Sequence, residues 1–287
     1  MHYKSFNPVS MPIQPLSSRP IGVMDSGVGG ISVLKHVHAL LPHEDLIYFA
    51  DSKYAPYGNK TPAEITARCF EIADFLIAKN AKALVVACNT ATAAAIDAMR
   101  EKYNLPNVNF PIIGMEPAVK PAAGASKNGV IGVLATVGTL KSVQFAALLE
   151  SYGRNVKVVT QACVGLVECI ERGELDTPET KALIRQYCLP LLAEGADTIV
   201  LGCTHYPLVK DVIREIVGAE ISLIDTGAAV AKQLKRQLEE KGLLSRCQEK
   251  VASHQTPKVD FWTNSEAENA QQVIESLWGK RAEVNML

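Results

Sequence analysis

Short apolar runs rich in valine and isoleucine alternate along this chain with longer segments in which apolar residues recur every three or four positions. The short runs have the composition of buried parallel strands, and the longer segments have the periodicity of amphipathic helices. Strands are expected at residues 21–24, 46–50, 83–87, 112–114, 130–134, 156–160, 198–202, 222–224 and 259–262. Helices are expected at residues 63–79, 91–103, 178–194, 208–217 and 228–241. The alternation predicts an α/β fold in which helices flank mainly parallel sheets.

Two of the expected strand ends occur twice in the chain, in the same order. The segment Ile-Gly-Val that begins at Ile21 recurs at Ile131. An apolar run that ends in a cysteine and a threonine-containing polar pair occurs at Cys88 and again at Cys203. Short apolar matches arise by chance in α/β proteins, whereas matched cysteines are harder to explain in that way. The repeat predicts two pseudo-symmetric lobes whose strand ends face a shared cleft.

The repeat also suggests how the chain divides between the two lobes. We expect residues 20–113 together with 225–287 to form a first lobe that carries Cys88. Residues 114–224 are expected to form a second lobe that carries Cys203. A chain of 287 residues is also nearer to two domains than to one.

The composition is that of a globular protein, with 48% hydrophobic and 21% charged residues. The 29 lysines and arginines nearly balance the 30 aspartates and glutamates, so nucleic acid is not an expected partner. No apolar run approaches the roughly 20 residues that cross a bilayer, so no membrane association is expected. Seven cysteines without a Cys-x-x-Cys pair indicate reduced thiols in a cytoplasmic protein. Residues 1–19 contain several prolines and no signal-like apolar run, and are interpreted as an N-terminal extension.

Cys88 and Cys203 each end an apolar run and precede an expected turn and helix. Backbone N–H groups at the start of a helix lower the pKa of a thiol and bind carboxylates, so we expect thiolate character and a small acidic substrate there. A cysteine at the end of a buried strand is otherwise a small hydrophobic residue. The remaining cysteines lack a partner in the repeat and are interpreted as packing or surface residues: Cys69, Cys163, Cys169, Cys188 and Cys247.

Two thiols on opposite faces of one carbon atom suggest a specific reaction. One thiol would remove a proton and the other would return a proton from the opposite side, which inverts the centre. The α-proton of an amino acid is weakly acidic, so each thiol needs a neighbour that keeps it correctly protonated. Asp25, at a strand end expected beside Cys88, and His205, two residues after Cys203, are the candidates. The alternatives are a helix cap for the aspartate and a hydrogen-bonding turn residue for the histidine.

The glycine-rich segment 25–30 matches neither the dinucleotide pattern nor the Walker pattern, so no nucleotide is expected. Its glycines either let the backbone approach a small ligand closely or make a tight turn. Residues 56–58 also fit an ordinary turn. Cys203 and His205 do not have the spacing of a zinc site, and no metal is expected.

Together these motifs resemble those of the glutamate racemases of bacterial cell-wall synthesis. The resemblance runs from about Pro20 to about Leu244 and rests on residues 25–30, 56–58, 87–91, 135–136 and 202–207. It implies two α/β lobes with the active site between them. It also implies interconversion of L- and D-glutamate without pyridoxal phosphate, metal or nucleotide.

The same resemblance implies roles for individual residues. Cys88 and Cys203 are the bases, and the helping groups in catalysis are Asp25, His205 and Glu171. The implied substrate contacts are Asp25, Ser26, Tyr57, Gly58, Asn89, Thr90, Thr136, Thr204 and His205. Family members carry the helping glutamate in a segment with two prolines, which residues 163–171 lack, so Glu168 and Glu171 are both candidates. The register favours Glu171.

Control by a cell-wall precursor accompanies a long N-terminal extension in part of the family, and such an activator and a homodimer are retained as open expectations. Aspartate racemase is the rival within the enzyme class, with the same two-cysteine logic and a shorter substrate, but the motifs favour glutamate. A two-lobed binding or sensor protein for an acidic metabolite is the rival from another class. The paired thiols favour an enzyme, because binding a carboxylate requires no sulfur.

Overall fold

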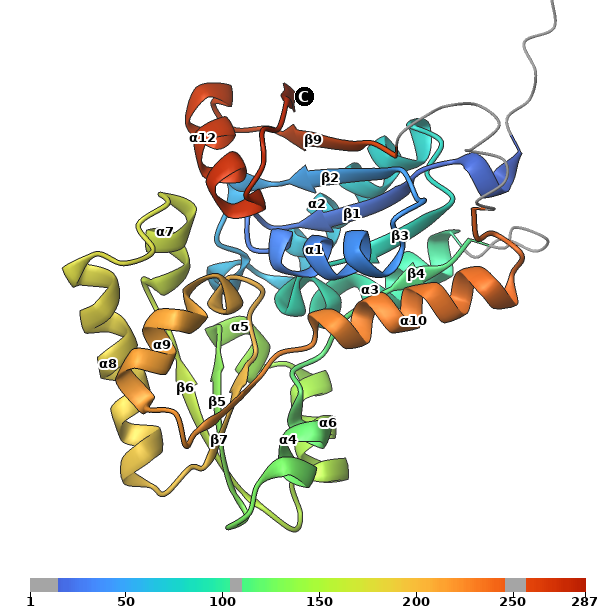
Figure 1. Ribbon diagram of the computed structural model, residues 1–287. Coiled ribbons are helices and arrows are strands. Elements are labelled where there is room, and N and C mark those ends of the chain that lie inside the picture. Colours follow the sequence, from blue (N-terminus) through green and yellow to red (C-terminus); the bar gives the residue numbers. More distant parts are fainter. Residues whose placement is uncertain (1–14, 104–109, 246–256) are drawn as a thin grey trace, which may run out of the picture.

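The computed structural model describes residues 15–103, 110–245 and 257–287, which form two parallel sheets flanked by helices (Figure 1). The first sheet has the strand order β10-β9-β2-β1-β3-β4 and the second has the order β6-β5-β7-β8. The predicted α/β class is confirmed. Residues 1–14 of the expected extension and Cys247 lie outside the described residues. Within the described ranges, no helix is both long enough and apolar enough to cross a membrane.

The first sheet and its helices form one lobe, called the first lobe below. Its strands are β1 (Ile21–Asp25), β2 (Leu46–Ala50), β3 (Ala83–Val86), β4 (Ile112–Ile113), β9 (Val259–Thr263) and β10 (Val284–Met286). Its helices are α1 (Ile31–Leu40), α2 (Pro62–Ala78), α3 (Asn89–Tyr103), α10 (Gly227–Glu240) and α12 (Ala267–Trp278). Since side chains alternate along a strand, Ile21 and Val23 pack with α1, α10 and α12, while Met24 packs with α2 and α3 on the other face.

The second sheet and its helices form the second lobe. Its strands are β5 (Val130–Ala135), β6 (Lys157–Ala162), β7 (Thr198–Leu201) and β8 (Ser222–Ile224). Its helices are α4 (Val119–Ala125), α5 (Val137–Leu140), α6 (Val143–Tyr152), α7 (Leu166–Glu171), α8 (Pro178–Ala193) and α9 (Lys210–Val217). Helices α4 and α6 cover one face of the sheet, and α7, α8 and α9 cover the other.

The two lobes repeat one strand arrangement. The order β2-β1-β3-β4 of the first sheet matches the order β6-β5-β7-β8 of the second. Ile21 and Ile131 lie in the central strands β1 and β5, and Cys88 and Cys203 follow the neighbouring strands β3 and β7. The matched segments therefore occupy equivalent places, which confirms the predicted pseudo-symmetry. It also brings both cysteines to the carboxyl edges of their sheets.

Local chemistry shifts several element boundaries near the cysteines. Helix α3 begins at Asn89, two residues earlier than expected, so Cys88 stands directly before its first turn. Helix α9 begins at Lys210, because a 3-10 turn that contains Pro207, η4 (Tyr206–Val209), precedes it. Strand β10 was not predicted. It adds three residues to the edge of the first sheet beside β9.

Candidate active site

The thiol of Cys88 lies between the ends of β1 and β3. Its Sγ atom is 3.4 Å from the backbone nitrogen of Ala91, which donates to it, and 3.6 Å from Ser26 Oγ, to which the thiol can donate. The side chain is buried. Burial raises the pKa of Cys88 well above its ordinary value, the negative charge of Asp25 adds to the rise, and the Ala91 N–H opposes it.

The expectation of thiolate character at Cys88 is therefore wrong for this geometry. Only one N–H group of the first turn reaches the sulfur. The loss of solvation around the charged form outweighs that single donor. Cys88 is consequently held as a thiol, which is the form that donates a proton.

The thiol of Cys203 heads a chain of three groups in the second lobe. Its Sγ atom is 3.6 Å from Nδ1 of His205, and Nε2 of His205 is 2.5 Å from Oε1 of Glu171. Burial opposes a charge on His205, but its bonds to Cys203 and Glu171 outweigh that effect, and the pKa of His205 lies well above its usual value. His205 therefore links the sulfur of Cys203 to the carboxylate of Glu171.

Glu171, the last residue of α7, also bridges the two lobes. Its Oε1 accepts a hydrogen bond from the backbone nitrogen of Val28 at 2.7 Å, and its Oε2 accepts one from Ser52 Oγ at 3.1 Å. Glu168 instead lines a small cavity between the lobes. Of the two candidate glutamates, Glu171 is the one that contacts His205.

Asp25 ends β1 on the other side of the cleft and is buried. Its Oδ2 accepts from the backbone nitrogen of Gly30, the N-cap residue of α1, at 2.8 Å. Its Oδ1 lies 3.5 Å from the hydroxyls of Ser26 and Thr204. Burial raises the pKa of Asp25 to about 6, although the charge of His205 opposes the rise.

Two glycines of segment 25–30 lie directly against side chains of the second lobe, which was not predicted from the sequence. A Cβ atom at Gly27 would collide with the carboxylate of Glu171, and one at Gly29 would collide with the ring of His205. Both of these side chains belong to the second lobe. The glycines therefore let the backbone of the first lobe approach Glu171 and His205 of the second lobe closely, which neither of the two expected explanations included.

A cluster of hydroxyls joins the lobes beside the expected substrate contacts. Thr90 Oγ1, at the start of α3, lies 2.8 Å from Thr136 Oγ1 and 3.1 Å from Thr139 Oγ1 of the second lobe. Gly58 packs so closely on Thr136 that a Cβ atom would lie 3.0 Å from the Cβ of Thr136. The hydroxyl of Tyr57 donates to the carboxylate of buried Asp51 and so points away from the cluster. The backbone of residues 57–58 is therefore available to contact a ligand, whereas the tyrosine hydroxyl is already bonded to Asp51.

Asn89 is buried, and both polar atoms of its side chain lack a hydrogen-bond partner among the described residues. An unpaired buried amide is costly in a native protein and calls for an explanation such as a ligand. Asn89 stands directly after Cys88, at the start of α3. Its amide therefore has the donor and the acceptor needed to bind a small polar molecule next to this thiol.

The space between the closed lobes is small. The cavity lined by Gly58, Thr136, Cys163 and Glu168 has a volume of about 20 Å³, which is about the space that a single water molecule needs. A wider pocket of about 680 Å³ lies outside it and is lined by Gly58 and Thr90 among others. The inner cavity is therefore too small to hold an amino acid. Cys163 contributes to the inner cavity as well as to packing.

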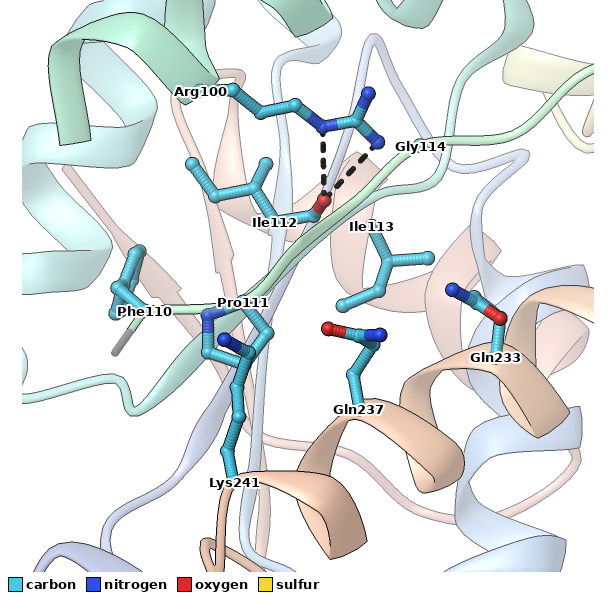
Figure 2. Close-up of a pocket in the computed structure, with 9 residues that line it drawn as sticks. All are labelled: Arg100, Phe110, Pro111, Ile112, Ile113, Gly114, Gln233, Gln237 and Lys241. Carbon is cyan, nitrogen blue, oxygen red and sulfur yellow. Dashed lines mark hydrogen bonds between the residues drawn. The ribbon is translucent and has the colours of Figure 1, made fainter. Parts of the chain in front are cut away.

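Other candidate sites lie away from the cysteines. Figure 2 shows a pocket of about 280 Å³ between α3, β4 and α10, where Arg100 Nε and Nη2 each donate to the carbonyl of Ile112 at 3.4 Å. Among the described residues, one group has ligand atoms close enough for a metal ion: Cys169, Glu174 and Glu179. The guanidinium of Arg172 already lies 3.5 Å from the sulfur of Cys169 and 2.7 Å from Glu174, where a cation would bind.

Several groups at the site were not found from the sequence. Ser52, Asp51 and Thr139 belong to it through contacts with Glu171, Tyr57 and Thr90. Asp51 and Ser52 directly follow β2, so the rule that polar residues gather at carboxyl strand ends could have found them. Thr139 lies within a helix and has no comparable signal.

Residues 21–234 match the family model described as Asp/Glu/Hydantoin racemase. The chain belongs to this family and is therefore an isomerase. It is 51% identical to the glutamate racemase of Ectopseudomonas mendocina, over 94% of this chain and 98% of that protein. It is 56% identical to the glutamate racemase of Pseudomonas syringae pv. tomato, over 83% of this chain and 85% of that one.

Solved structures of glutamate racemases have the same fold. An isoform from Bacillus anthracis superposes with a TM-score of 0.82 at 34% identity, covering 94% of this chain and 98% of that one. Escherichia coli glutamate racemase, in complex with L-glutamate and the activator UDP-MurNAc-ala, superposes with a TM-score of 0.78 at 30% identity, with 94% and 98% coverage. The resemblance noted in the sequence is confirmed at the level of family and fold.

Proposed function

We propose that this protein interconverts L- and D-glutamate in the cytoplasm and so supplies D-glutamate for peptidoglycan synthesis. The observation that carries the proposal is the convergence of two strand-end thiols from two pseudo-symmetric lobes, each with its own acid–base neighbour. Cys88 has Asp25 beside it, and Cys203 has His205 and Glu171. One thiol removes the α-proton, and the other returns a proton on the opposite face.

The two sides of the site differ in a way that suits this chemistry. On the first lobe, burial favours the neutral thiol of Cys88, which is ready to donate. On the second lobe, His205 lies against the sulfur of Cys203 and can take up and return its proton. In the direction from L- to D-glutamate, Cys203 removes the α-proton and Cys88 donates one. The side chains of Ser26, Asn89, Thr90, Thr136 and Thr204 and the backbone at 57–58 hold the substrate.

The division of the chain follows from the same proposal. The segment 20–113 with 225–287 provides Cys88, and the segment 114–224 provides Cys203. Sheet composition supports this division, because β9 returns to pair with β2 after the whole second sheet has been completed. The chain passes from one lobe to the other near residues 114 and 225. We expect the lobes to rotate apart at these two connections to admit substrate.

Purified protein is expected to racemise L-glutamate without any added cofactor, and chiral chromatography of the product measures it. Activity should survive exhaustive treatment with EDTA, because the acid–base groups are all side chains. L-Aspartate should have a kcat/KM at least about tenfold lower, since one methylene is worth ~1–3 kcal/mol in discrimination. Binding of glutamate without turnover would favour a sensor, and better turnover of aspartate would favour the rival racemase.

We also propose that a cell-wall precursor activates the enzyme, as the activator in the E. coli complex does for that relative. Adding UDP-MurNAc-ala should raise kcat/KM at least about fivefold, the lower end of ordinary allosteric coupling. UMP at the same concentration is the control for the nucleotide alone. Equal rates with and without the precursor would remove this part of the proposal. A homodimer is the proposed assembly.

A further inference from the structure

A groove of about 370 Å³ lies on the outer side of Glu171, between α7 and α12. These two helices are neighbours at the left of Figure 1, one from each lobe. Val28, Ser52 and Glu171 line its inner part, and the exposed residues Arg172 and Gln272 line its outer part. The groove has room for several water molecules at about 30 Å³ each.

Of the three groups in the Cys203 chain, only Glu171 lines this groove. The side chain of His205 is 1% exposed, whereas that of Glu171 is 15% exposed. The Ser52 hydroxyl and the Val28 N–H each donate to one oxygen of the carboxylate. These two donors hold the carboxylate of Glu171 in a position where it contacts His205 and also lines the groove.

Racemisation by two thiols leaves the enzyme in a changed protonation state. Conversion of L- to D-glutamate adds a proton to Cys203 and removes one from Cys88. Before the next L-glutamate reacts, the Cys203 side must release one proton and the Cys88 side must take one up. A buried set of groups needs a route to solvent for that exchange.

We propose that the groove between α7 and α12 is a solvent port, through which the Cys203, His205 and Glu171 set exchanges protons with water between turnovers. This inference rests on the proposed racemisation. The thiol of Cys203 gives its proton to Nδ1 of a neutral His205 imidazole, and in the same relay the Nε2 proton passes to Glu171 Oε1 and from there to water in the groove. The net change is one thiol converted to a thiolate, one imidazole proton moved from Nε2 to Nδ1, and one proton added to solvent. Ser52 is a positioning residue, since it acts by orienting Glu171.

The first test narrows the port with Gln272→Trp, a change at an exposed position outside the acid–base groups. Resetting follows product release, so slowing it should lower kcat and KM together, by about threefold or more, and leave kcat/KM unchanged. Ser276→Trp, at another exposed position of α12 that does not line the groove, is the matched control. Wild-type values of kcat and KM in Gln272→Trp would overturn the port, as would a loss confined to kcat/KM.

The second test uses formate as a small carboxylate that can enter the groove. Glu171→Ala should lose activity, and formate should restore it by occupying the space beside His205, Val28 and Ser52. Initial rates from L-glutamate should be restored at least about tenfold, within the range that a positioned proton-transfer group contributes. Asp25→Ala is the control, because Asp25 does not line the groove and formate should not rescue it.

The double variant Glu171→Ala with Gln272→Trp closes the same route and should not respond to formate. No rescue of Glu171→Ala, or equal rescue of the double variant, would overturn the port. The outcome for the proposed function is separate, because it depends on wild-type turnover of glutamate in the absence of formate. If the wild-type enzyme racemises glutamate, the proposed function stands, and the variants then test the solvent port alone.

Discussion

Cys88→Ser is expected to lose racemisation of glutamate by roughly 10³-fold or more and still to process the L-configured form of a substrate analogue. The analogue is a glutamate with a leaving group on the β-carbon. Elimination from it needs one deprotonation only, because the carbanion expels the leaving group instead of being reprotonated. Cys203 can supply that single step. A serine hydroxyl is far too weak an acid to replace the missing thiol.

Cys203→Ser should be the mirror image and retain only elimination from the D-configured analogue. Chiral chromatography measures racemisation, and release of the leaving group measures elimination from each enantiomer. Cys169→Ser is the matched control, since its thiol is buried in the second lobe and lies beside Arg172 rather than in the cleft. Near wild-type racemisation by either cleft variant, or elimination from the same enantiomer by both, would contradict the two-thiol mechanism.

Asp25→Asn is expected to lower activity about 10²-fold or more and at the same time to stabilise the fold at alkaline pH. Burial raises the pKa of Asp25 from 3.8 to about 6, so the native protein binds this proton more tightly than the unfolded chain does. Stability therefore falls as the pH rises through the interval from about 4 to about 6. This rise in the pKa of Asp25 corresponds to about 3 kcal/mol at most.

An asparagine at position 25 carries no charge, so the variant should lack this loss. Its amide oxygen can still accept from Gly30, and its amide nitrogen can donate to the hydroxyl of Ser26 or Thr204. Urea unfolding at several pH values measures the effect. The variant should gain up to about 3 kcal/mol over wild type at pH 8, and the gain should vanish below about pH 4. A difference that does not change with pH would show that burial of the charge is not its cause.

Asp51→Asn is the contrasting control in the same experiment. Asp51 is also a buried aspartate at the end of a strand of the first sheet, but Arg68 Nη2 lies 2.7 Å from its carboxylate. Removing this carboxylate leaves the guanidinium without its buried partner, so the variant should be less stable than wild type at pH 8. The two substitutions are chemically identical and should have opposite effects, because only one of the two carboxylates has a cationic partner in contact.

The amino-acid sequence by itself determined the class of the fold, the existence of two similar lobes and the place of two matched cysteines at equivalent strand ends. Each of these depends on local patterns. Apolar runs of four to six residues specify buried strands, and the matched segments at Cys88 and Cys203 specify equivalent strand ends. In a parallel sheet the carboxyl end of a strand has a known place, so residue order alone located both cysteines at the cleft.

Only the tertiary structure decided how these groups are protonated and connected. The contact of Glu171 with His205 joins residues 34 positions apart, and the bond from Ser52 to Glu171 joins residues 119 positions apart. The pKa of Cys88 rises because its sulfur is buried away from water, which no local pattern encodes. Solvation and long-range contacts depend on what covers a site from every direction. For that reason the chain order could name the candidate residues, while the packing of one lobe on the other decided which of them are in contact.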